Sequence, residues 1–254
     1  METSAEEPSP FFVMQCYGDV EQLPRCLKQL RRHYPKARVL VISDGFEDRT
    51  IASIGARYGV EVEMGERLFT AEHGGAAVHR LIARFLDGPE PVMLKIDPDT
   101  DVVGRVKFSA EDFDIPSVSG TIQYAGVAPR RLVSVQGGCI IVNRLAAERI
   151  MASGVLLGQD MGPPDFIWAV NAMLQERARQ MGLTSHDWTL GYACKALGIR
   201  VEARSDVYSV WRPRLADWRL SRSGYAIVHP HMNLGICLYQ EAKRLVKRML
   251  RLTH

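Results

Sequence analysis

The first part of the chain alternates short apolar runs with segments in which apolar residues recur at helical spacing. The runs have the length and composition of buried strands and cover residues 11–17, 37–45, 60–64 and 91–96. Between them lie segments with apolar positions three or four residues apart, as on one helix face, at 20–34, 48–59 and 74–86. This order predicts an α/β protein with a mostly parallel sheet that helices cover on both faces.

The later part of the chain has a less regular pattern. Strands are predicted at 115–126 and 130–144, and the second range contains the glycine pair Gly137-Gly138. Helical spacing returns at 145–154, 164–182 and 185–198, and late strands are expected within 199–211 and 224–231. There is no internal repeat or long linker, so we expect one domain over residues 11–239. A disordered tail at 1–10 precedes it, and a basic amphipathic helix at 240–254 follows it.

Composition narrows the class of protein. The 254 residues are 46% hydrophobic and 24% charged, as in an ordinary soluble globular protein. A formal net charge of +3 is too small to indicate a nucleic-acid partner, and no apolar run reaches the ~18 residues of a membrane span. The five cysteines form no CxxC pair, which favours free thiols in a reducing cytoplasm.

An acidic cluster, "KIDPDTD" at 95–101, directly follows the predicted strand 91–96. Asp97 and Asp99 therefore lie at the carboxyl end of a strand, where doubly wound sheets bind their ligands. Two carboxylates separated by one residue can converge on a hard cation such as Mg²⁺ or Mn²⁺. The alternative is an acidic turn without an ion, because Asp and Pro are common turn residues.

The order and spacing of several motifs resemble the nucleotide-sugar glycosyltransferases of the GT-A fold, in particular inverting, family-2-like members. The motifs are "ISDG" (42–45), "KIDPDTDV" (95–102), "VQGGCIIVNR" (135–144) and "SHDWTLGYACKALGIRVEARSDV" (185–207). The resemblance spans about residues 11–235 and implies a single Rossmann-like domain. One departure is His186-Asp187, where inverting members often carry Glu-Asp. Asp187 keeps the second acidic residue of that pair.

The resemblance implies a set of residues that bind the nucleotide-sugar. Cys16, Tyr17 and Gly18 would line the pocket of the base, and Asp44 would hydrogen-bond it. Arg80 would turn toward the nucleotide. Lys95, Asp97, Gly137 and Gly138 complete the expected donor site. Two plainer readings stay open, namely an Asp-Gly turn at Asp44 and a solvated helix face at Arg80.

The same resemblance implies a metal site and a catalytic base. Asp99 would bind Mn²⁺ or Mg²⁺ directly and Asp97 would hold the ribose or the metal shell, while Asp101 is expected to be a bystander. A third ligand would come from His229 or His231, which could instead be loop histidines without a metal.

Asp187 would remove the proton of the acceptor hydroxyl; its plainer role is an acid favoured at a helix start. His186 and Trp188 are expected to border the acceptor.

The C-terminal helix is basic on one side and apolar on the other. It could lie on an anionic membrane, or pack on the domain as an ordinary terminal helix. The first reading suits a lipid-linked acceptor at the inner face of a membrane, and the second suits any carbohydrate acceptor.

The leading hypothesis is an inverting transferase that uses a UDP-sugar. Its rivals are a retaining transferase of the same fold and a non-catalytic nucleotide-sugar-binding protein. A nucleotidyltransferase is disfavoured because "CYGDVEQLPR" carries only one glycine.

Overall fold

The seven elements predicted for the first part of the chain are all present in the computed structural model. It describes residues 9–17, 20–45, 49–69, 73–125, 132–157, 186–210, 213–220 and 224–252. The elements are β1 (Phe11–Cys16), α1 (Leu23–His33), β2 (Val39–Asp44), α2 (Arg49–Tyr58), β3 (Glu61–Gly65), α3 (Gly74–Leu86) and β4 (Val92–Ile96). Because β1, β2 and β4 are buried along their whole length, the apolar runs predict them well.

The later elements agree less closely with the sequence pattern. They are β5 (Asp101–Val102), α4 (Glu111–Asp114), β6 (Ser117–Ala125), β7 (Leu132–Asn143), α5 (Arg144–Ser153), α8 (His186–Leu197), β8 (Arg200–Ala203), β9 (Val207–Ser209), α9 (Asp217–Leu220), β10 (Ile227–His229) and α10 (Leu234–Leu252). The pattern misses the short elements β5, α4 and α9, and α10 begins well before residue 240. The predicted helix 164–182 and the tail 1–8 lie outside the described residues.

The large sheet has seven strands in the order β3-β2-β1-β4-β7-β6-β8. Strands β3, β2, β1 and β4 run parallel to one another, β6 is parallel to β8, and β7 is antiparallel to both of its neighbours. The mostly parallel sheet predicted from the sequence is confirmed. The chain moves from β1 outward to β3 and returns to β4 on the other side of β1. The strand order therefore reverses between β1 and β4, and ligands bind beside such a point in open α/β sheets.

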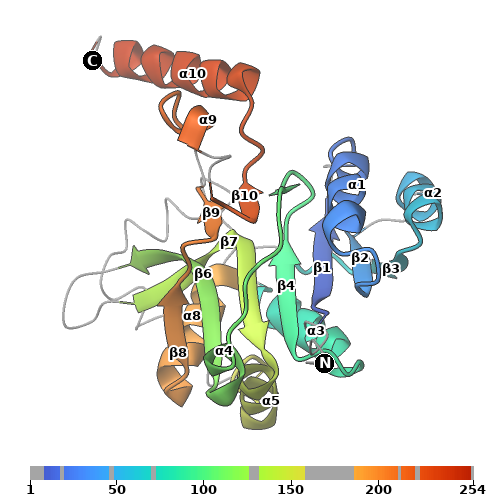
Figure 1. Cartoon of the computed structure of the whole chain (residues 1–254). Coiled ribbons are helices and arrows are strands. Elements are labelled where there is room, and N and C mark those ends of the chain that lie inside the picture. The colour runs from blue at the N-terminus through green and yellow to red at the C-terminus, as the bar shows by residue number, and fades with distance from the viewer. Residues whose placement is uncertain are drawn as a thin grey trace, which may run out of the picture.

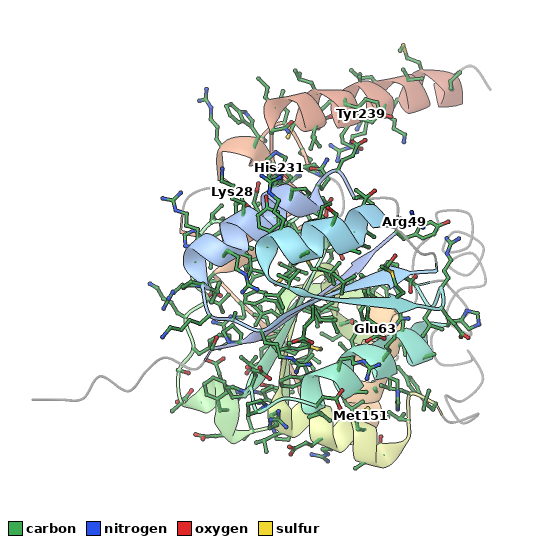
Figure 2. The ribbon with its side chains drawn as sticks, turned by 90° about the vertical axis from the view of Figure 1, so that its right-hand side faces the viewer. Lys28, Arg49, Glu63, Met151, His231 and Tyr239 are labelled. Carbon is green, nitrogen blue, oxygen red and sulfur yellow. The ribbon has the colours of Figure 1, made fainter. Side chains whose placement is uncertain are left out.

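Helices cover the sheet on both faces, as Figure 2 shows with α1 and α2 on one side and α3 and α5 on the other. The first face buries Leu23, Leu27 and Leu30 of α1 against the sheet. The second face is covered by α3, α5 and α8, and Phe85 and Leu190 are buried there. Each helix thus buries the apolar stripe that its spacing predicted.

A second, small sheet holds the late strands in the order β5-β10-β9. The sequence pattern predicted strands here, and the structure places β9 and β10 in this separate sheet. In the small sheet β10 is antiparallel to β5, with Val228 opposite Asp101. This pairing carries the end of β10 to the acidic segment that follows β4.

The last helix, α10, lies at the top of the molecule in Figure 1, beyond α9 and β10. Among the helices that the structure describes, none combines the length and the apolar character that crossing a membrane requires.

Candidate active site

Three side chains predicted as metal ligands meet at the carboxyl edge of the sheet. Ligand atoms of Asp97, Asp99 and His229 all lie within 4.8 Å of one another. The Nε2 atom of His229 is 3.2 Å from Oδ2 of Asp97 and 3.1 Å from Oδ1 of Asp99. Two carboxylates and one imidazole form a donor set that suits Mn²⁺ or Mg²⁺, so these residues fit a divalent cation.

The turn after β4 brings the two carboxylates together. The amide of Thr100 donates to the carbonyl oxygen of Asp97 at 3.0 Å, and the amide of Asp97 donates to Oγ1 of Thr100 at 3.2 Å. Thr100 is fully buried and its Oγ1 also lies 3.3 Å from the carbonyl oxygen of Gly138. The acidic turn and the candidate metal site are therefore the same feature.

His229 is held in place by its contact with β7. A Cβ atom built on Gly138 would lie only 1.8 Å from Nδ1 of His229, so the ring occupies the space that any other side chain would fill. Ser209 Oγ lies 3.4 Å from the same nitrogen. Because Nδ1 faces Gly138 and Ser209, the other ring nitrogen, Nε2, faces Asp97 and Asp99.

Two basic side chains, Lys95 and His229, lie beside the carboxylates of Asp97 and Asp99. Lys95 is 1% exposed; its Nζ contacts the Asp97 carboxylate and donates to the carbonyl oxygen of Gly137 at 2.6 Å. Burial alone would lower the pKa of His229, but hydrogen bonds to Asp97 and Asp99 raise it to about 9. Burial would raise the pKa of Asp97, yet Lys95 and His229 together hold it well below its usual range.

The other candidate histidine belongs to a different cluster. Nδ1 of His231 contacts the carboxylate of Asp101 and lies 2.7 Å from Nη1 of Arg25. Asp101 also pairs with Arg25 and accepts a hydrogen bond from Gln29 at 2.7 Å. Figure 2 places His231 beside α1 and beneath α10. His231 thus ties the β10–α10 connection to α1 and lies with Asp101 instead of with Asp97 and Asp99.

Asp187 is half-buried at the start of α8. Its Oδ2 accepts hydrogen bonds from the amide of Gly137 at 2.9 Å and from Nε2 of Gln123 at 3.2 Å. The carbonyl oxygen of the same Gly137 accepts from Lys95, which contacts Asp97. One residue, Gly137, thus connects the predicted base to the candidate metal group.

Asp44 and Arg80, two of the predicted donor-site residues, form an ion pair with each other. The Asp44 carboxylate is fully buried and accepts hydrogen bonds from the amides of Leu68 and Phe69, at 3.0 and 2.9 Å. Nη2 of Arg80 donates to it at 2.6 Å. Contact between Asp44 and a base stays a prediction, whereas the solvated helix face considered for Arg80 is wrong, because its side chain is only 12% exposed. The pair instead anchors the segment after β3.

The residues at the end of β1 differ widely in exposure. Cys16 is fully buried, whereas Tyr17 is 46% exposed. The guanidinium of Arg67 lies 3.8 Å from the Tyr17 ring centroid, and its Nη1 donates to the Tyr17 hydroxyl at 2.8 Å. Gly18 lies outside the described residues. The base pocket proposed for this corner stays a prediction.

Gln15 is a candidate residue that the sequence reasoning missed. It is 5% exposed, and within the part of the chain that the structure describes neither of its amide atoms has a hydrogen-bond partner. Strand alternation places Gln15, Asp44 and Lys95 on the same face at the ends of β1, β2 and β4. An unsatisfied buried amide costs about 1–3 kcal/mol, so a polar ligand here would relieve that cost. The only signal in the sequence is one amide inside the apolar run "FFVMQCY".

The predicted acceptor residues flank Asp187 along the chain. Trp188 is half-buried on α8, and the side chain of His186 lies outside the described part. Their contact with an acceptor stays a prediction.

Comparison with known proteins identifies the fold. No protein-family model matches the sequence, and no curated protein matches it either. The structure is similar to the galactosyltransferase LgtC, solved in complex with donor and acceptor sugar analogs, with a TM-score of 0.50 and 13% identity over 86% of each chain. This similarity confirms the predicted GT-A type of α/β fold; at this identity it shows the fold alone.

The glycosyltransferase GlyE of Streptococcus pneumoniae TIGR4 is a further match. The TM-score is 0.47 at 10% identity, and the apo form gives 0.48 at 11%. The match covers 89% of this chain but 55% of GlyE, so this chain spans about half the length of GlyE.

Proposed function

We propose that this protein is a metal-dependent glycosyltransferase that moves a sugar from a nucleotide-sugar to an acceptor hydroxyl. The donor proposed first is a UDP-sugar. One observation carries the proposal: Asp97, Asp99 and His229 converge at the carboxyl edge of a GT-A fold, and Gly137 connects them to Asp187. The GT-A fold supports the class of reaction, because ligands of such sheets bind where the strand order reverses. The acceptor is a carbohydrate or a lipid-linked sugar.

Asp97, Asp99 and His229 would hold Mn²⁺ or Mg²⁺. A divalent cation bound there would supply positive charge that stabilises a diphosphate leaving group. Lys95 adds a fixed positive charge beside Asp97. Lys95 is buried and contacts both Asp97 and Gly137, so its side chain has already lost its rotamer entropy on folding. An exposed lysine would lose that entropy when the ligand binds.

Asp187 acts as the base in the proposed reaction. The hydrogen bonds from Gly137 and Gln123 stabilise the carboxylate form and fix its orientation. A carboxylate within hydrogen-bond reach of the acceptor hydroxyl takes up its proton as the oxygen attacks the anomeric carbon. Attack opposite the leaving diphosphate inverts the configuration at that carbon.

The donor's nucleotide occupies the ends of β1 and β2 in this proposal. Gln15 offers one donor group and one acceptor group from a buried position. Tyr17, with Arg67 beside it, presents an exposed aromatic ring on which a base can stack.

The test is a screen of UDP- and GDP-sugars with Mn²⁺, with Mg²⁺ and with EDTA. Thermal stabilisation and release of the nucleoside diphosphate are measured, and NMR of the released or transferred sugar gives its anomeric configuration. We expect at least one nucleotide-sugar to stabilise the protein only when metal is present. The proposal fails if no nucleotide-sugar stabilises the protein or turns over. Retention of configuration would instead leave the transferase assignment intact and remove Asp187 as the inverting base.

A further inference from the structure

Within the described residues, one face of the terminal helix α10 contacts the rest of the protein. Cys237 is fully buried and packs in a cluster with Val228 and Met232. Four and seven residues further on, Glu241 accepts a hydrogen bond from the amide of Leu215 at 3.4 Å, and Arg244 donates to the carbonyl oxygen of Pro213 at 3.3 Å. Positions separated by four and seven residues lie on one helix face, so the stripe of Cys237, Glu241 and Arg244 faces the protein.

The apolar face of α10 points away from that stripe. Its large apolar side chains are between 44% and 63% exposed: Leu234, Leu238, Tyr239, Leu245, Val246, Met249 and Leu250. At 3.6 residues per turn they form one continuous arc, and its centre near Ala242 lies about 140° around the helix axis from Cys237. An ordinary terminal helix buries such an arc on its own domain. Here the arc is turned outward, so that interpretation of the helix does not fit.

The charged residues of α10 are almost all basic. The helix carries five basic residues and a single acidic one, Glu241, which is already paired with Arg244. The basic residues are Lys243, Arg244, Lys247, Arg248 and Arg251. An apolar arc bordered by cationic residues matches a bilayer whose apolar interior lies beneath anionic headgroups. A second copy of this chain would bring the same positive charges together, so charge complementarity favours the lipid surface.

We propose that α10 docks this protein onto an anionic lipid bilayer, with the apolar arc inserted into the headgroup boundary. The helix then lies in the plane of the membrane surface, since it does not have the apolar character that crossing a membrane requires. β10 ends at His229 and α10 begins at Leu234, so docking brings the candidate metal group close to the bilayer. Vesicle binding needs neither donor nor metal, and its outcome is therefore independent of the proposed transfer reaction.

The experiment is flotation of the full chain with lipid vesicles. One set is phosphatidylcholine alone, and the other contains about one third phosphatidylglycerol. We expect binding to the anionic vesicles only, because each basic residue near such a surface contributes roughly fivefold in partitioning. Lys243 borders the apolar arc beside Tyr239, so Lys243→Gln should lower binding by about that factor, and high salt should reduce it further.

A matched pair of changes isolates the apolar arc. Leu245→Glu combined with Met249→Glu removes two exposed apolar side chains of α10, each worth at least about tenfold in partitioning, so binding should disappear. Leu145→Glu makes the same kind of change at a 39% exposed leucine on α5 and should leave binding unchanged. Circular dichroism is expected to show the same melting curve for all variants, since these side chains are exposed.

Three outcomes would overturn the proposal. The first is no binding of the unaltered chain to anionic vesicles. The second is equal binding to neutral and anionic vesicles, which would remove the role of the basic residues. The third is an unaltered chain that binds no vesicles and forms a dimer in light scattering, while the double variant is a monomer. A second copy of the chain would then cover the arc.

Discussion

Replacing Gly138 by alanine should displace His229 and weaken metal binding, although Gly138 offers no ligand itself. The added Cβ would lie 1.8 Å from Nδ1 and 2.1 Å from Cγ of His229, whereas an ordinary carbon contact needs about 3.5–4.0 Å. The ring must therefore move by roughly 1.5–2 Å, and ligand distances in metal sites tolerate only about 0.2 Å. A misplaced ligand of this kind lowers metal affinity by about 10–100-fold.

The assay is isothermal titration of the full chain with Mn²⁺, alone and with a stabilising nucleotide-sugar. His229→Ala supplies the comparison, because Gly138→Ala should match it in Mn²⁺ affinity. Gly104→Ala is the control, since its Cβ would meet nothing closer than 3.4 Å. Overpacking also costs about 1–3 kcal/mol of stability, so a melting curve accompanies each titration. Unchanged Mn²⁺ affinity in a folded Gly138→Ala protein would refute the role assigned to His229.

Three further changes test separate parts of the site and fold. Asp187→Asn should lower transfer by about 10²–10⁴-fold while donor-induced thermal stabilisation stays the same; loss of both would contradict a base role. Asp99→Asn should remove the Mn²⁺-dependent part of donor binding, and donor binding that is indifferent to this change would exclude Asp99 as a ligand. Burial would raise the pKa of Asp206, but hydrogen bonds from Arg204 and the Lys107 amide lower it. The stability from this pair is therefore present above the carboxyl's unfolded pKa and is lost as pH falls below it. Asp206→Asn should flatten that acid limb in chemical unfolding.

Local pattern was sufficient to predict the elements that are buried along their length. β1, β2 and β4 are apolar on both faces because helices cover both sides of the sheet. Asp97 and Asp99 could be placed at a strand end for the same reason. Short elements such as β5 depend on pairing with distant β10, and a two-residue strand leaves no periodicity in the sequence.

The choice between His229 and His231 could not be made from the sequence. Both follow the same apolar strand, and Pro230 separates them. The pairing of β10 with β5 and β9, and the gap left by Gly138, decide that His229 reaches the carboxylates. The partners of Asp44 could not be predicted for a related reason: they include backbone amides of Leu68 and Phe69, and any sequence supplies such groups.

The glycine pair at 137–138 shows why these contacts matter for the proposed chemistry. Both glycines lie within β7, where its register with β6 shifts opposite the stretch between Gly120 and Ile122. Gly138 leaves room for the His229 ring, and Gly137 donates its amide to Asp187 while its carbonyl oxygen accepts from Lys95. Strand β7 thus fixes the separation between the proposed base and the candidate metal-binding carboxylates, as transfer between two bound substrates requires.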